Sequence, residues 1–120
     1  MLTLTFSGHI TPKKNAFRAG VSSSGRLFQY RRKDAIDSQE SLAWQARTQA
    51  SKQGWKLTEK PVRLRVMMRK TRADAVGVLE TLLDAMEDIV YKNDKQVVDC
   101  HYSWEDLEED VTAKLFLEEL

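Results

Sequence analysis

The sequence is poor in the residues that build several common kinds of site. It has one cysteine, Cys100, so no disulfide can form within the chain, which is typical of a reducing compartment. Its two histidines, His9 and His101, have no second His or Cys at metal-ligand spacing, which argues against a zinc site. It also lacks a Gly-rich phosphate loop and a serine-nucleophile motif. Any catalysis must therefore use other side chains.

Long apolar runs are missing as well. No segment approaches the roughly 20 apolar residues that a membrane-spanning helix needs. The N-terminus alternates like a strand and does not resemble a basic, apolar secretion leader. We therefore expect a cytoplasmic protein with no membrane partner. Its 120 residues, 42% of them hydrophobic, predict a single domain over residues 1–120.

The net charge of +1 conceals a strong separation of charge along the chain. Residues 1–72 contain 16 Lys or Arg against four Asp or Glu, whereas residues 73–120 contain three against 14. A nucleic-acid-binding protein needs a basic surface to displace phosphate counterions, and a metal-dependent nuclease also needs carboxylates. The two halves supply both. The alternative is that the halves simply attract each other, within one chain or between two copies.

Hydrophobic periodicity predicts an α+β fold. Alternating patterns predict strands over 2–7, 62–69, 97–104 and 111–117, and residues 17–30 predict a hairpin with a polar tip. A helix is expected from Asp34 or Asp37 to about Gln53. Its expected inner face consists of Ile36, Leu42, Ala43, Trp44, Ala46 and Ala50. A second helix follows residue 74. The predicted architecture is a mixed sheet of about four or five strands with two helices packed on one face.

The stretch from Arg72 to Asp99 is the most informative part of the chain. Its helix is acidic, with an apolar face formed by Val76, Leu79, Leu83 and Met86. Asp74 occupies an N-cap position, and Asn93-Asp94 forms a turn before the next strand. If that strand pairs beside the strand preceding the helix, Asp74 and the Asp94 turn could come together. Small metal-dependent nucleases gather carboxylates from separate elements in this manner.

These residues resemble the RusA family of Holliday junction resolvases, which occur in phages and prophages. The family shows Asp-x-Asp-Asn-x-x-Lys, then Asp-Ala-Leu on the same helix, then a turn ending Asp-Asp-x-Gln-Val. The matches are Asp74, Asp84-Ala85-Met86 and Asn93-Asp94-Lys95-Gln96-Val97. Pro12-Lys13-Lys14-Asn15 is similar to a loop that follows the family's first strand. Three positions depart from the pattern: Val76 replaces the second Asp, Gly77 the Asn and Glu80 the Lys.

The resemblance implies that Asp74 and Asp94 are catalytic ligands of Mg²⁺, with Mn²⁺ as a possible substitute. We hypothesise that Glu80, one helical turn after Val76, provides the third acidic ligand. Lys70, Arg72, Lys92 or Lys95 would replace the missing lysine charge. Asp84, one turn further on, is either an additional or outer-sphere group or an ordinary surface residue. The alternatives for Asp74 and Asp94 are a helix N-cap and a plain chain reversal.

Basic residues of the first half are the predicted DNA contacts. Arginine binds phosphate through its planar fork, and basic residues interleaved with aromatics in the hairpin suit a nucleic-acid-binding arm. The predicted contacts are Lys13, Lys14, Arg18, Arg31, Arg32, Arg63, Arg65, Arg69, Lys70 and Arg72. The resemblance implies branched double-stranded DNA as substrate. It also implies a homodimer, because symmetric cleavage of a four-way junction requires two active sites.

Three functions remain open from the sequence. The leading one is a Mg²⁺-dependent endodeoxyribonuclease that acts on Holliday junctions in recombination and repair. The second is a catalytically inactive RusA-like protein that binds branched DNA. The third is a homodimeric interaction module whose oppositely charged halves drive self-association.

Overall fold

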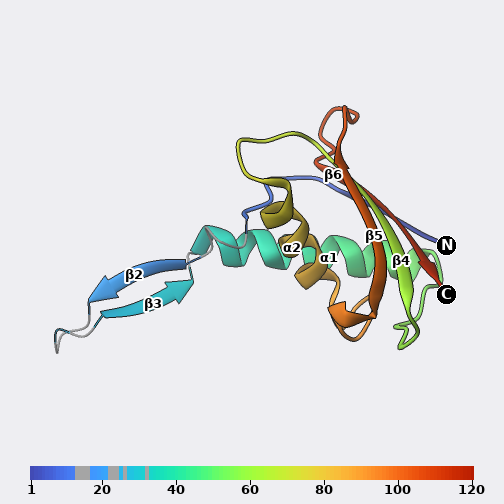
Figure 1. The fold of residues 1–120 in the computed structure, drawn as a ribbon, viewed down its shortest axis with the longest axis horizontal. Coiled ribbons are helices and arrows are strands. Elements are labelled where there is room, and N and C mark those ends of the chain that lie inside the picture. Colours follow the sequence, from blue (N-terminus) through green and yellow to red (C-terminus); the bar gives the residue numbers. More distant parts are fainter. Residues whose placement is uncertain (13–16, 22–24, 26, 32) are drawn as a thin grey trace.

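The computed structural model describes the chain except residues 13–16, 22–24, 26 and 32; within 17–21 and 27–31 it describes only the backbone. The described residues form nine elements in chain order, and Figure 1 shows how they are arranged. They are β1 (Leu2–Phe6), β2 (Phe17–Val21), β3 (Leu27–Arg31), α1 (Lys33–Lys52), β4 (Val62–Met68), α2 (Ala75–Met86), the 3-10 helix η2 (Asp94–Gln96), β5 (Val97–Trp104) and β6 (Ala113–Glu119). The predicted α+β class is confirmed.

The central sheet has the strand order β1-β6-β4-β5. Strand β6 is antiparallel to both β1 and β4, whereas β5 runs parallel to β4. Both long helices lie on one face of this sheet, as predicted (Figure 1). Because β4 and β5 are parallel, α2 is the crossover that returns the chain from the end of β4 to the start of β5.

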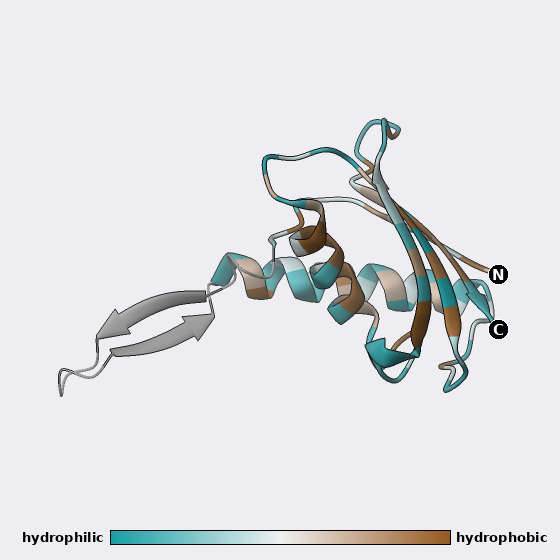
Figure 2. Ribbon diagram, in the orientation of Figure 1, coloured by the Kyte–Doolittle hydropathy of each residue, from teal (hydrophilic) through white to brown (hydrophobic). Residues whose placement is uncertain are grey.

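Alternating side chains build the core between the sheet and the helices. Every second residue of β1, β4 and β6 is buried, as the period of two requires. These strands contribute Leu2, Leu4, Phe6, Val62, Leu64, Val66, Met68, Ala113, Leu115 and Leu117. The helices face them with their apolar sides, such as the hydrophobic face of α2 (Figure 2). The outer face of the sheet carries polar and charged residues between a few apolar ones.

The buried faces of the helices differ from the predicted ones. On α1, Ala35, Leu42, Ala46 and Ala50 are buried, but Trp44 is 65% exposed. On α2, Val76 is 49% exposed, and Gly77, Val78, Leu82 and Ala85 are buried instead. Both sequences contain more apolar residues than one helix face can hold. Their pattern alone therefore did not fix the helix rotation.

Glutamines of α1 seal the free edge of β1. Three of them, four residues apart, each accept a backbone N–H and donate to the C=O of the same residue, at 2.7–3.1 Å; the pairs are Gln45–Ser7, Gln49–Thr5 and Gln53–Thr3. The spacing fits because four helical residues rise about 6.0 Å and two strand residues about 6.7 Å. An edge that would otherwise invite pairing is thereby closed.

The other edge of the sheet is formed by β5, in which the alternation of Val98, Cys100, Tyr102 and Trp104 predicts a core-facing side. Val98 is 61% exposed and Tyr102 is 44% exposed, although their alternation suggested burial. For Val98 the reason is a shift in the pairing register: Val62 lies opposite Val97 and Arg63 opposite Asp99, so Val98 is an extra residue with no partner on β4. In addition, β5 is the last strand in the sheet order. The edge of β5 that faces away from β4 pairs with no other strand in the described part of the chain.

The predicted hairpin is present in the described backbone. Strands β2 and β3 pair antiparallel, with Phe17 opposite Arg31 and Val21 opposite Leu27. Figure 1 shows this hairpin extending from the start of α1, away from the central sheet. Among the described residues, no helix has the length and apolar character to span a membrane.

Candidate functional site

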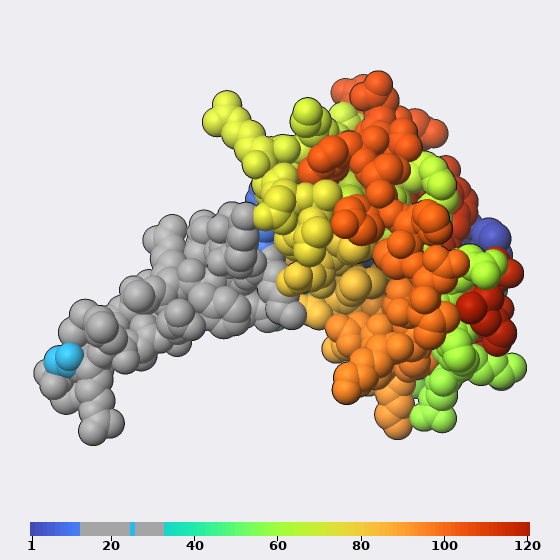
Figure 3. Space-filling model, in the orientation of Figure 1, coloured from blue at the N-terminus to red at the C-terminus, as the bar shows by residue number. Residues whose placement is uncertain are grey.

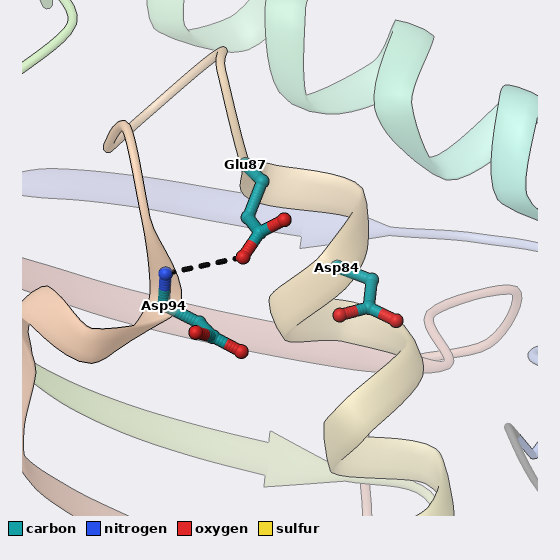
Figure 4. Close-up of side chains that lie close together, drawn as sticks. All are labelled: Asp84, Glu87 and Asp94. Carbon is teal, nitrogen blue, oxygen red and sulfur yellow. Dashed lines mark hydrogen bonds between the residues drawn. The ribbon is translucent and has the colours of Figure 1, made fainter.

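Three carboxylates meet where α2 ends and η2 begins. Asp84, Glu87 and Asp94 each offer an oxygen, and these oxygens all lie within 4.8 Å of one another. Figure 4 shows the three side chains around a common space, with Asp84 one turn before Glu87 and Asp94 on the returning chain. Asp84 and Glu87 are half-buried, whereas Asp94 is exposed. The cluster is therefore open to solvent on the Asp94 side.

The backbone around the cluster holds Asp94 in place. Glu87 is the C-cap residue of α2, and its Oε1 accepts the backbone N–H of Asp94 at 3.1 Å. The chain reverses between them, with Asp88 in the left-handed region at φ 62°. Asn93 then caps η2, accepting the N–H of Lys95 on its side chain. A hydrogen-bonded turn therefore presents Asp94 to the helix end.

The electrostatics of the cluster favour a cation. Carboxylates in the last turn of a helix face the negative end of its dipole, and the last turn of α2 contains no basic residue. At 4.8 Å, two carboxylates repel by about 1 to 3.5 kcal/mol at effective dielectrics of 80 to 20. Such an arrangement is stabilised when a cation binds between the oxygens.

The hydroxyl of Tyr91 lies in the negative electrostatic potential of these carboxylates. Burial, followed by Glu87, Asp94 and Asp84, raises the pKa of its hydroxyl well above the usual value. The phenol therefore stays protonated and donates to the Leu83 carbonyl at 2.6 Å. This partly buried bond ties the turn after α2 to the helix itself.

Comparison with known proteins identifies the family of the chain. The family model of endodeoxyribonuclease RusA matches residues 10–115. The chain belongs to the RusA family. This family comprises metal-dependent endodeoxyribonucleases that act on branched DNA. A search of curated proteins found no match.

In this RusA-family chain, Asp74 lies far from the cluster. Asp74 is the N-cap of α2, whereas Asp94 contacts its C-cap residue. The 12 residues between the caps span about 18 Å at 1.5 Å per residue. Two oxygens bound to one Mg²⁺ are at most about 4.2 Å apart. Asp74 and Asp94 of one chain therefore do not share an ion in this arrangement.

The prediction for these two residues relied on the pairing of β4 with β5. β4 and β5 do pair, with Leu64 opposite Cys100, but this pairing does not bring Asp74 and Asp94 together. A parallel pair requires the intervening helix to run back along the strands. The crossover helix begins at the C-terminal end of β4, beside Asp74, and finishes at the N-terminal end of β5, beside Asp94. The pairing thus separates the two carboxylates.

The N-cap alternative for Asp74 is what the structure shows. Its Oδ1 accepts the backbone N–H of Gly77 at 2.7 Å. Gly77 explains one departure from the family pattern, because an added Cβ would lie 3.0 Å from this oxygen and 3.2 Å from Pro12 Cβ. Glu80 is exposed and is not one of the three clustered carboxylates. Its role as a ligand, like that of Asp74, stays a prediction.

The predicted DNA-contacting residues occupy several parts of the molecule. Lys13, Lys14 and Arg32 lie outside the described residues, as do the side chains of Arg18 and Arg31, whose backbones belong to the hairpin. Lys70 and Arg72 are exposed between β4 and α2, at the opposite end of α2 from the cluster. The basic segment after β4 therefore adjoins Asp74, as expected, but not the clustered carboxylates.

Two arginines of this set are engaged within the chain. Arg69 donates from Nε to Val111 O at 2.9 Å and from Nη2 to the carbonyls of Leu107 and Glu108. It thus holds the loop before β6, which differs from the predicted DNA contact. Arg63 Nε lies 2.9 Å from Asp99 Oδ2 on the outer face of the sheet, and Arg65 is exposed on the same face.

Glu87 was missed as a site residue in the sequence. From the sequence, Glu87 was interpreted only as one of the residues that make this helix acidic. The available signal was its spacing from Asp84, because residues i and i+3 lie on one side of a helix. A second signal was that Asp84 and Glu87 both lie near the C-terminal end of the helix, where the helix dipole disfavours negative charge.

Proposed function

We propose that this protein is a divalent-metal-dependent endodeoxyribonuclease that cleaves branched DNA, with Asp84, Glu87 and Asp94 as the metal ligands. The observation that carries the proposal is the convergence of these three carboxylates within 4.8 Å in a RusA-family chain. We further propose that it acts in the cytoplasm, as expected from the sequence.

The donor set suits Mg²⁺ or Mn²⁺. All three donors are carboxylate oxygens, which hard divalent ions prefer, and side-chain movements of less than about 1 Å bring them to bonding separation. A bound ion would polarise the scissile phosphate and lower the pKa of a coordinated water. The half-buried Asp84 and Glu87 would fix the ion against the helix end. The exposed Asp94 would leave the outer side open to a phosphate.

Lys95 supports the proposal as a source of positive charge. It follows Asp94 on η2 and is exposed. Lys92, in contrast, has its Nζ 3.4 Å from Glu59 Oε1. We therefore assign to Lys95 the electrostatic role that the family lysine would have at position 80. The hairpin and the exposed Lys70 and Arg72 would bind the DNA backbone through phosphate contacts.

A cleavage assay tests the proposal. We expect the protein to nick a synthetic four-way junction in Mg²⁺ or Mn²⁺, and to leave it intact in EDTA. The sequence-matched linear duplex serves as the control substrate. Junction binding without cleavage in Mg²⁺, Mn²⁺ or Co²⁺ would rule out the nuclease and support the second reading, a protein that only binds branched DNA. One observation favours that alternative: Asp74, which the family resemblance implies as a ligand, caps the end of α2 opposite to the clustered carboxylates.

The open edge of β5 supports a homodimer. Strand β1 is sealed by glutamines, but β5 has an unpaired outer side among the described residues and exposes Val98 and Tyr102. In Figure 3 the surfaces of α2 and β5 adjoin on one side of the molecule, so this apolar edge borders the helix that carries the cluster. We propose that a second copy covers β5, which would join the two active sites required at a four-way junction.

Val98→Asp is expected to convert the dimer to a monomer. A buried, unpaired carboxylate costs about 3–5 kcal/mol, which corresponds to a rise of about 150- to 5,000-fold in the dimer dissociation constant. Sedimentation velocity over a concentration series measures it. Leu57→Asp is the matched control, since Leu57 is 46% exposed in a loop outside β5. An unsubstituted protein that stays monomeric at all concentrations would contradict the dimer.

A further inference from the structure

The side chain of Gln96 joins two backbone segments beside the cluster. Its Oε1 accepts the N–H groups of Lys92 and Asn93 at 2.9 and 2.8 Å. Its Nε2 donates to the carbonyls of Thr58 and Lys60 at 2.9 and 3.0 Å. A primary amide has two acceptor sites and two donor hydrogens, so all four are used. Gln96 is half-buried, and its bond to the Thr58 carbonyl is partly buried as well.

These bonds surround the part of the chain that carries Asp94. Residues 92 and 93 directly precede Asp94, and Gln96 follows it by two positions. The segment at Thr58 is further fixed by its own N–H, which donates to Val90 O at 3.2 Å. Gln96 therefore fastens the turn on both sides of Asp94 to the chain entering β4. On the other side, Glu87 holds the Asp94 N–H.

We propose that Gln96 is a positioning residue that keeps the Asp94 carboxylate within reach of the Asp84 and Glu87 carboxylates. The inference rests on the proposed metal site. Gln96 does not touch the ion in this scheme; it acts through the backbone of residues 92–94. A glutamine is suited to this task because a carboxylate could not donate to the two carbonyls and an ammonium could not accept from the two N–H groups.

Gln96→Met in the full-length protein tests the proposal. Methionine has similar length but makes none of the four hydrogen bonds. Gln53→Met is the matched control, because Gln53 also clamps backbone through its amide, but at the β1 edge. Both variants lower the midpoint of thermal unfolding. Only Gln96→Met should raise the Kd for Mn²⁺, by about tenfold or more, measured by electron paramagnetic resonance below the unfolding transition.

Amide hydrogen exchange provides a readout that needs no metal. In Gln96→Met the Asp94 amide should exchange faster relative to the core amides of β4, whereas Gln53→Met should leave that ratio unchanged. Unchanged exchange at Asp94, or an equal loss of Mn²⁺ affinity in both variants, would overturn the role of Gln96. Absence of Mn²⁺ binding by the unsubstituted protein would reject the proposed function instead. In that case, the ratio of the exchange rate at Asp94 to those of the β4 core amides would be the only test of whether Gln96 positions Asp94.

Discussion

Asp94→Asn is expected to lower metal-dependent cleavage of a four-way junction by about 100-fold or more. A metal ion contributes several kcal/mol of transition-state stabilisation, and each 1.36 kcal/mol is a factor of ten in rate. The same substitution should raise the Kd for Mn²⁺ by at least about tenfold, and Asp84→Asn should do likewise. Calorimetric titration with Mn²⁺ and single-turnover cleavage measure the two effects. Asp106→Asn, in the exposed loop before β6, is the charge-matched control.

Asp74→Asn decides between the two ligand sets. Asparagine is as good an N-cap as aspartate, so the substitution removes the charge without removing the cap. If Asp84, Glu87 and Asp94 are the ligands, the Kd for Mn²⁺ should be unchanged in Asp74→Asn. The reason is that Asp74 lies at the opposite end of α2. If Asp74→Asn weakens Mn²⁺ binding as strongly as Asp94→Asn, the ligand set implied by the family resemblance is correct and the cluster is not the metal site.

Replacing Arg18, Arg31 and Arg32 with alanine is expected to weaken junction binding by about 10²–10³-fold at 0.1 M salt. Each phosphate contact contributes a slope of about −0.9 to the dependence of log K on log salt, so three lost contacts reduce the slope by about 2.7. The hairpin extends from the molecule, where it can reach along a DNA arm (Figure 1). Fluorescence anisotropy at several salt concentrations measures both quantities.

The control for the hairpin removes the same amount of charge elsewhere. Lys52 is exposed at the C-terminal end of α1 and Lys56 and Lys60 are exposed beyond it, about 30 Å along the helix from the hairpin. Their triple alanine variant should change the slope little. Equal losses in both variants would show that binding depends on total charge and not on the hairpin.

Local patterns in the sequence were sufficient for the secondary structure. Alternation predicted β1, β4 and β6, the polar tip predicted the hairpin, and Asp74 marked the start of α2. Each of these features depends on neighbours within a few residues: the pleat repeats every two residues, and a cap bonds three residues ahead. The RusA resemblance likewise rested on short motifs and is confirmed over residues 10–115.

Contacts between residues far apart in the sequence could not be predicted from local patterns and were found only in the tertiary structure. Nothing in the residues near the glutamines of α1 reveals that these side chains bond the edge of β1, about 45 residues away in the sequence. Similarly, the alternation of β5 predicted burial, because nothing in its residues reveals that it ends the sheet. Arg69 had the appearance of a phosphate-binding residue, yet it bonds a loop about 40 residues away.

The sequence by itself determined that carboxylates and cations are present, in which elements they lie, and to which family the chain belongs. Only the tertiary structure decided which carboxylates meet. The physical reason is the direction of the crossover: a helix between two parallel strands must traverse their length, so its two ends lie apart. Asp94 therefore joins Asp84 and Glu87 at the C-terminal end of α2, while Asp74 caps the N-terminal end.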